Sequence, residues 1–347
     1  MGSLHIKIAE RLHPFSHQSG TVCLIPKTTW EVQVFPALLR FRDLESSQHF
    51  ELALDFKGPI KDFTLEQDLE KGCVRVYGMS QTGYIDYQIT RDKNTLNLVR
   101  RKGESISLPV ALKDEFFPLL PERLSLGMHR SQDWTLVQRR MDLSEIFPTW
   151  LRLAALTPQR KIKELPSVGT LILLQECKNA ISKREKKQLS PLFTALFQTA
   201  FQGILSPRLM DEHFLGIIPQ SEKEIPSSLS SLVLLQESAK LIRELFFKEE
   251  EKKIFLLPCL PPEMHSGRFI SIRTSTGDEI SMEWSKKLLK KVVWRNATQK
   301  EIVLELQASL KSFRLRHALR DRGTRISTDE PLFLKAGQTL YLDRFQK

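Results

Sequence analysis

The chain has 347 residues, a length that predicts two or three domains or one large domain. Its formal net charge is +11, and its 41% hydrophobic and 27% charged residues are ordinary for a folded protein. No apolar run approaches the ~18 residues needed to span a bilayer. The N-terminal residues contain no apolar signal core. We therefore expect a cytoplasmic protein with no membrane span and no secretory signal.

The cysteine pattern favours buried free thiols. The four cysteines are far apart and none has the paired spacing of a disulfide framework or a zinc site. Free thiols persist in a reducing cytoplasm, which agrees with the expected location. These residues are Cys23, Cys73, Cys177 and Cys259.

Residues 1–115 predict an antiparallel β-sandwich. Short apolar or alternating segments recur at the spacing of a sandwich, and Gly58-Pro59 and Lys93-Asn94 mark turns between them. Residues 49–56 alternate, so that one face of the expected strand is apolar. The expected strands are residues 21–25, 30–35, 38–41, 49–56, 72–77, 84–90, 95–100 and 105–108.

Residues 116–253 predict a helical region. Residues 132–140 form one expected helix, and a second opens at Ser144 and carries Trp150. The hexapeptide at 171–176 (LILLQE) resembles that at 232–237 (LVLLQE), and each introduces apolar residues at helical spacing. Either two copies of a helical hairpin or a coincidence between two Leu-rich helices explains this similarity. We expect a small bundle or a reduced α/α-barrel-like layer.

Residues 254–347 predict a second β-sandwich. The apolar run at 254–257 ends at Pro258, because proline excludes a continued helix or central strand. Gly267 opens a hairpin with a turn at 276–278, and alternate residues of the returning arm share one apolar face. The whole chain is therefore predicted to be an α+β multidomain protein with a β-sandwich at each end. The apolar residues of that arm are Ile280, Met282 and Trp284.

Positive charge is concentrated in this last region, where residues 264–347 hold 17 Lys and Arg against 9 Asp and Glu. The segment 311–325 has six basic residues and one acidic residue. Such a patch binds nucleic acid, an anionic surface or an acidic partner. Phe313 is its one candidate for stacking on bases, and a solvated strand and loop is the simpler explanation. Nucleic acid is therefore an alternative and not the expected partner.

The most polar cluster beside an aromatic side chain lies just before and within the first expected helix. Trp134 is predicted to stack on a sugar ring while its polar neighbours hold the hydroxyl groups, which requires an exposed ring of Trp134 or Trp150. The structural alternative is that Ser131 or Asp133 caps the helix and Trp134 packs against the sheet. The predicted substrate-binding residues are His129, Arg130, Gln132, Trp134 and Arg139.

No catalytic pair stands out. Glycoside hydrolysis needs two carboxylates on opposite sides of the scissile bond. Asp211 and Glu212 are candidates, but adjacent side chains on a regular element diverge, so a partner must come from another segment, such as Asp133. A loop acid and a capping residue is the simpler interpretation of the adjacent pair. His13 and His17 have no third ligand in view and no Gly-rich phosphate loop occurs, so we expect no metal and no cofactor.

The last quarter of the chain resembles a known family. A strand, the pattern LLPxLPPE, a glycine, a hairpin and a final EW resemble the start of the C-terminal β-domain in bacterial α-L-fucosidase-type glycoside hydrolases and related six-hairpin glycosidases. Residues 335–340 (KAGQTL) resemble the closing strand of that domain. The matching residues are Leu256, Leu257, Pro258, Leu260, Pro261, Pro262, Glu263, Gly267, Glu283 and Trp284.

The resemblance implies a carbohydrate-active ancestor, but this chain departs from the family pattern. Twelve barrel helices of about eleven residues do not fit into the helical region. The Asp-containing segment before the last barrel helix is replaced by residues 225–230 (IPSSLS), which contain neither Asp nor Gly. We therefore expect a protein that binds carbohydrate or a protein partner in the groove between helices and sheet. The alternatives are an active hydrolase or phosphorylase with relocated carboxylates, and a basic binding module.

Overall fold

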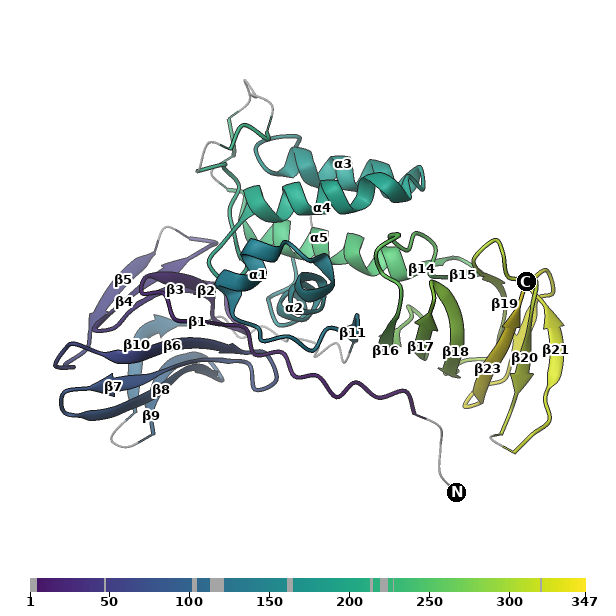
Figure 1. Ribbon diagram of the computed structural model, residues 1–347, viewed down its shortest axis with the longest axis horizontal. Coiled ribbons are helices and arrows are strands. Elements are labelled where there is room, and N and C mark those ends of the chain that lie inside the picture. Colours follow the sequence, from purple (N-terminus) through teal and green to yellow (C-terminus); the bar gives the residue numbers. More distant parts are fainter. Residues whose placement is uncertain are drawn as a thin grey trace.

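The computed structural model describes residues 5–46, 48–101, 105–112, 122–160, 165–212, 215–218, 224–226, 228–318 and 320–347. Mostly antiparallel sheets lie at both ends of an elongated molecule and the helices lie between them (Figure 1). The predicted β-rich α+β architecture is confirmed. The domain limits at 115 and 253 stay a prediction, and the first lies outside the described residues.

Two sheets form a sandwich-like unit at the N-terminal end. In β8, alternate side chains such as Ile85, Tyr87 and Ile89 are buried. The four-stranded sheet consists of β2 (Thr21–Leu24), β3 (Trp30–Phe35), β4 (Leu38–Asp43) and β5 (His49–Ala53), in that order. The six-stranded sheet consists of β1 (Phe15–Ser16), β6 (Lys61–Asp68), β7 (Cys73–Ser80), β8 (Gly83–Asp92), β9 (Thr95–Arg100) and β10 (Ile106–Ala111).

The strands β5 and β6 differ from the prediction for identifiable physical reasons. The strand β5 ends at Ala53 and not at Phe56, because Phe56 N–H donates to Leu54 O (2.8 Å) in a tight turn that leaves the sheet. The strand β6 was not predicted because Gln67 occupies one of its buried positions and interrupts the apolar alternation. Its amide Nε2 donates to Leu24 O (2.7 Å), which satisfies that donor within the core.

Five helices occupy the middle of the described chain. The first begins at Trp134 and not at residue 132, because the Asp133 side chain accepts the Thr135 N–H and caps it. Each repeated hexapeptide begins a helix, as predicted. None of the helices described has the length and apolar character to cross a bilayer. The helices are α1 (Trp134–Arg140), α2 (Leu143–Ala155), α3 (Leu171–Ser182), α4 (Lys186–Ala200) and α5 (Leu232–Phe246).

A second pair of sheets forms the C-terminal end. The predicted hairpin is confirmed, with Ile280, Met282 and Trp284 buried on one face of β17. The seven-stranded sheet consists of β11 (Arg123–Ser125), β16 (Gly267–Arg273), β17 (Glu279–Ser285), β18 (Leu288–Arg295), β23 (Thr339–Gln346), β20 (Ser312–Arg316) and β21 (Thr324–Ser327). The four-stranded sheet consists of β14 (Phe247–Glu250), β15 (Lys253–Leu256), β19 (Lys300–Glu305) and β22 (Leu332–Leu334).

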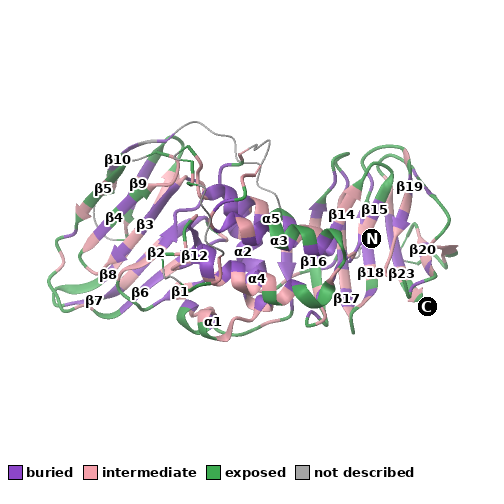
Figure 2. Cartoon of the chain, turned by 90° about the horizontal axis from the view of Figure 1, so that it is seen from above, coloured by how far each residue is buried: buried purple, intermediate pink, exposed green. Residues whose placement is uncertain are grey.

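The core is continuous across the molecule. Buried residues extend from the N-terminal sheets through the helices into the C-terminal sheets (Figure 2). All four cysteines are buried and free, as predicted. Burial raises the pKa of Cys73 to about 11 and that of Cys177 to about 12, so both thiols stay protonated at neutral pH.

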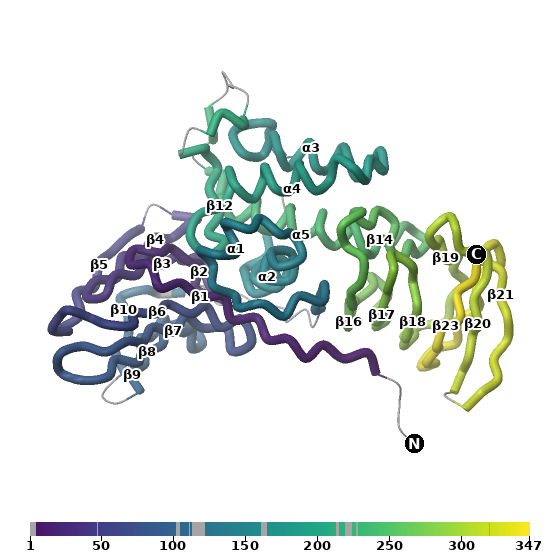
Figure 3. The backbone as a smooth tube through the Cα atoms, viewed as in Figure 1, coloured from purple at the N-terminus to yellow at the C-terminus, as the bar shows by residue number. Residues whose placement is uncertain are grey.

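An N-terminal connecting segment, residues 5–12, joins the two ends of the molecule (Figure 3). Ile6 packs with Val293 and Tyr341 of the seven-stranded sheet. Arg268 Nη1 donates to Lys7 O (3.1 Å), and Leu12 enters the main core at the other end. The first described residues thus lie on strands from the last quarter of the chain.

Candidate binding cleft

A cleft of about 610 Å³ lies between the N-terminal sheets and the helices. Its walls are the turn between β1 and β2, the helix α1, the end of α4, the hairpin that follows α4, and part of the segment 215–218. This volume falls within the range of about 300–1,000 Å³ typical of small-molecule sites. We call it the helix–sheet cleft.

The hairpin β12 (Phe201–Gln202) and β13 (Ser206–Pro207) sets the width of this cleft by docking on β2. The Ile204 N–H donates to Val22 O (2.8 Å). Gly203 has φ +49°, and a Cβ at this position would lie 2.0 Å from Val22 O. Only glycine permits this close approach, so the residue fixes the hairpin against the sheet.

The described side chains that line the helix–sheet cleft are uncharged. Two glutamines are held in place, because Gln33 Nε2 donates to Gly20 O (3.1 Å) and Gln138 Nε2 donates to Gly203 O (3.2 Å). Their amide oxygens remain as acceptors. The polar lining residues are Ser16, Gln18, Ser19, Thr21, Gln33, Thr135, Gln138, Gln198 and Gln202.

Trp134 borders the cleft without offering a ring face to it. Its side chain is only 2% exposed, and its indole meets Phe197 edge-on, with ring centroids 6.2 Å apart. Trp150 is fully buried. The expectation that one of these rings is open to solvent is therefore wrong. Asp133 caps α1, as the structural alternative proposed, but the ring contact of Trp134 is with Phe197 of α4 and not with the sheet.

Three predicted residues, Arg130, Gln132 and Trp134, line a separate cavity of about 40 Å³. Such a space holds no more than a few water molecules. Arg130 Nη1 lies 3.0 Å from Glu145 Oε1, and His129 Nε2 lies 3.7 Å from Glu10 Oε1. The structure thus brings four of the five predicted binding residues into one region. There Arg130 forms an ion pair, Gln132 Oε1 accepts the His13 N–H (2.6 Å) and Trp134 packs against Phe197.

The fifth residue and the candidate carboxylates lie elsewhere. Arg139 is exposed on α1 and lines neither cavity. Asp133 Oδ1 accepts the Thr135 N–H (3.0 Å), and Asp211 Oδ2 accepts the Leu215 N–H (2.8 Å). Thr135 and Leu215 line the cleft, so both carboxylates border it, but each is used to hold backbone. Glu212 is exposed.

Arg208 contacts Gln198, which lines the helix–sheet cleft, and no pattern in the sequence indicated this position. It is buried, its Nε donates to Thr199 O (2.8 Å), and its Nη2 donates to Gln198 O (3.3 Å). Burial lowers the pKa of this guanidinium, and the charges of Glu212 and Asp211 oppose that effect. Asp211 accepts a backbone N–H and Glu212 is exposed, which agrees with the interpretation of the adjacent pair as a capping residue and a loop acid.

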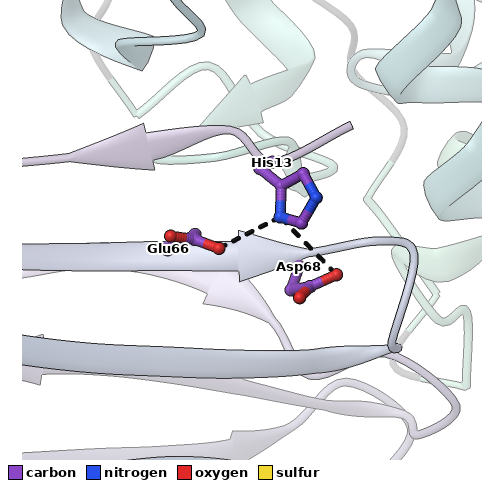
Figure 4. Close-up of side chains that lie close together, drawn as sticks. All are labelled: His13, Glu66 and Asp68. Atoms are coloured by element: carbon purple, nitrogen blue, oxygen red, sulfur yellow. Dashed lines mark hydrogen bonds and ion pairs between the residues drawn. The ribbon is translucent and has the colours of Figure 1, made fainter. Parts of the chain in front are cut away.

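One histidine lies among carboxylates (Figure 4). His13 Nδ1 lies 3.0 Å from Glu66 Oε1 and 3.6 Å from Asp68 Oδ1, so the three are close enough to share a metal ion. Asp68 Oδ1 also accepts the N–H groups of Glu70 (3.0 Å) and Lys71 (2.8 Å). These contacts hold His13, which directly follows the N-terminal connecting segment, beside β6.

Part of the basic segment at 311–325 is used within its sheet. Arg314 and Arg316 both pair with Asp343, at 2.7 and 2.6 Å. Burial alone would raise the pKa of Asp343, but hydrogen bonds and charge from the two arginines bring it below the usual value. Arg325 donates to Ser312 Oγ (2.6 Å). These three side chains stabilise the neighbouring strands β20, β21 and β23.

The residues that line the helix–sheet cleft lie in several separate parts of the sequence. The glutamines of the cleft come from separate segments, so no local sequence motif predicts that they lie together. The resemblance to α-L-fucosidase-type enzymes stays a prediction. Comparison with known proteins finds no matching family model and no matching curated protein.

Proposed function

We propose that this protein binds a neutral carbohydrate in the helix–sheet cleft and does not hydrolyse it. The observation that carries this proposal is a cleft of about 610 Å³ whose described side chains bear amides and hydroxyls but no charge. Amide and hydroxyl groups both donate and accept hydrogen bonds, as sugar hydroxyls do. A charged ligand would find no opposite charge among these side chains.

The lining also has an apolar part suited to the C–H surface of a sugar. Val22 and Met141 are half-buried and line the cleft, and the rings of Phe197 and Phe201 are buried behind this surface. Gln33 and Gln138 are already oriented by their own hydrogen bonds, so less side-chain entropy is lost when a ligand accepts or donates there. Preset polar groups around an apolar floor are typical of small-molecule sites.

The placement of the carboxylates supports binding without turnover. A glycosidase needs one carboxyl group as acid and another as base or nucleophile, both reaching the scissile bond. Asp133 caps α1 and Asp211 holds the backbone at Leu215. Neither side chain lines the cleft.

The binding test is titration calorimetry with neutral trisaccharides: maltotriose, cellotriose and chitotriose. Gln198→Met and Gln202→Met remove amides that make no hydrogen bond to any described residue, so the fold should survive. Each should weaken binding by about tenfold, the effect of one hydrogen bond. Gln188→Met is the matched control, because Gln188 is exposed on α4 and lies outside the cleft.

The turnover test is release of reducing ends from the same trisaccharides, compared between the wild type and Asp133→Asn. We expect no release from either, while binding persists in both. Release that disappears in Asp133→Asn with the fold intact would establish the hydrolase alternative. Absence of binding by every trisaccharide would refute the proposed function.

A further inference from the structure

A second cavity of about 610 Å³ lies on the N-terminal sandwich and shares no lining residue with the helix–sheet cleft. It is formed by the first half of β8, the end of β9, the β7–β8 turn and Phe56, which follows the strand β5 of the other sheet. We call it the sandwich cavity.

Tyr87 and Arg100 form one wall of this cavity. They are directly opposite each other in the β8–β9 register, so their side chains point to the same face of the sheet. The ring of Phe56 stacks on Tyr87 with centroids 6.1 Å apart, and the Arg100 guanidinium lies 5.9 Å from the Phe56 centroid. A cationic group and a phenol thus meet beside an aromatic face.

Both polar groups lack a partner. The Tyr87 side chain is 1% exposed, and neither its hydroxyl nor the buried Nε of Arg100 has a hydrogen-bond partner among the described residues. Buried polar groups are nearly always paired, so each such group needs an explanation. Burial raises the pKa of Tyr87, so the phenol keeps its proton at neutral pH and remains a donor.

The surrounding charges favour an anion. Asp86 is the single carboxylate that lines the cavity, and it is bound by Arg75 (2.7 Å) and approached by Arg101 (3.5 Å). Arg100 has no carboxylate within 4 Å in the described part of the chain. The wall therefore presents donors and an uncompensated positive charge, which a carboxylate complements.

We propose that the sandwich cavity binds a small organic carboxylate with an aromatic or aliphatic body. The carboxylate accepts hydrogen bonds from the Tyr87 hydroxyl and the Arg100 guanidinium. The body of the ligand packs against Phe56, Ile85 and Tyr84, of which Tyr84 is exposed although aromatic. Burial of the apolar body and pairing of the two donors then favour the complex together.

The experiment uses fluorine NMR of 4-fluorophenylacetate with the full chain, and 4-fluorophenylacetamide as its uncharged analogue. The wild type should bind the acid at least about tenfold more tightly than the amide. Tyr87→Phe removes only the unpartnered hydroxyl and should weaken acid binding about tenfold without lowering the Tm. Arg100→Gln should weaken acid binding further and leave amide binding unchanged.

Arg40→Gln is the matched control, because Arg40 lies on the same sandwich and pairs with Glu51 but lines neither cavity. Its acid affinity should stay within about twofold of the wild type. Equal binding of acid and amide, or acid binding unaffected by Arg100→Gln, would overturn the proposal. So would the absence of binding at millimolar concentration by 4-fluorophenylacetate, benzoate and hexanoate alike, since these cover both aromatic and aliphatic bodies.

Discussion

Tyr87 in the N-terminal sandwich and Asp278 in the C-terminal sandwich are buried polar residues with different surroundings. At the N-terminal end, the Tyr87 hydroxyl is buried beside a large cavity and has no partner. At the C-terminal end, Asp278 is fully buried but accepts from Trp294 Nε1 (2.9 Å) and the Ala297 N–H (2.9 Å), and pairs with Lys300 Nζ (2.5 Å). Unused donors beside open space indicate binding, whereas a saturated carboxylate indicates a structural role.

The largest expected effect comes from disrupting the contact between the β12–β13 hairpin and β2. In Gly203→Ala, the added Cβ would overlap Val22 O, which lies 2.0 Å from its position. We expect the free energy of unfolding to fall by about 3 kcal/mol or more, measured by urea denaturation. Gly216→Ala is the control, since Gly216 also has a positive φ of +69° but open space around it. A loss near ~1 kcal/mol in both variants would contradict this account.

The second prediction tests the contrast between Asp278 and Tyr87 directly. Asp278→Asn leaves the Lys300 ammonium without its buried partner, so we expect a loss of about 3 kcal/mol. Tyr87→Phe removes a hydroxyl without a partner, so its free energy of unfolding should stay within about 0.5 kcal/mol of the wild type or rise. Urea denaturation measures the free energy of unfolding of both variants and tests this difference. Similar losses in the two would remove the distinction between the sandwiches.

The smallest expected effect is the loss of folding stability at low pH. The hydrogen bond from Arg75 lowers the pKa of Asp86, and the charges of Arg75 and Arg101 add to this, against the effect of burial. A depressed folded pKa means that the stabilisation is present above the unfolded value of ~3.9 and is lost as the pH falls through the folded value. Urea denaturation at falling pH should therefore show the gap between wild type and Asp86→Asn closing below about pH 4.

Asp343 gives the same test in the C-terminal sandwich, since Arg314 and Arg316 depress its pKa against the effect of burial. The gap between wild type and Asp343→Asn should also close in acid. Parallel curves for wild type and variant at either site would show that the ion pair does not stabilise the fold. If the gap closes at only one of the two sites, the sandwich that contains that site is the one that its ion pair stabilises.

The elements that follow from the sequence are those whose pattern is local. The alternation of Ile280, Met282 and Trp284 predicts their shared buried face, and the repeated Leu-rich hexapeptides predict two helix starts. The strand β6 was missed because a buried, hydrogen-bonded Gln67 looks like a solvent position. Local sequence patterns indicate which apolar side chains are buried. They do not indicate which polar side chains are buried with a hydrogen-bond partner.

The candidate site follows from tertiary contacts and was therefore not predictable. Trp134 is conspicuous among polar neighbours in the sequence, yet Phe197 covers it from a helix far along the chain. The glutamines of the cleft meet only because the hairpin at Gly203 docks on β2. Asp133 was foreseen as a helix cap because capping depends on the next few residues alone.

The N-terminal connecting segment has a consequence for how the protein is made. Lys7 and Arg268 are 261 residues apart in the chain, and Val293 and Tyr341 lie further still from Ile6. At about 5–20 residues per second, a ribosome needs on the order of tens of seconds to supply these partners. Until then the apolar side of Ile6 stays uncovered while the N-terminal sheets are free to form. The residues made early in translation therefore reach their final position only when the last strands have emerged.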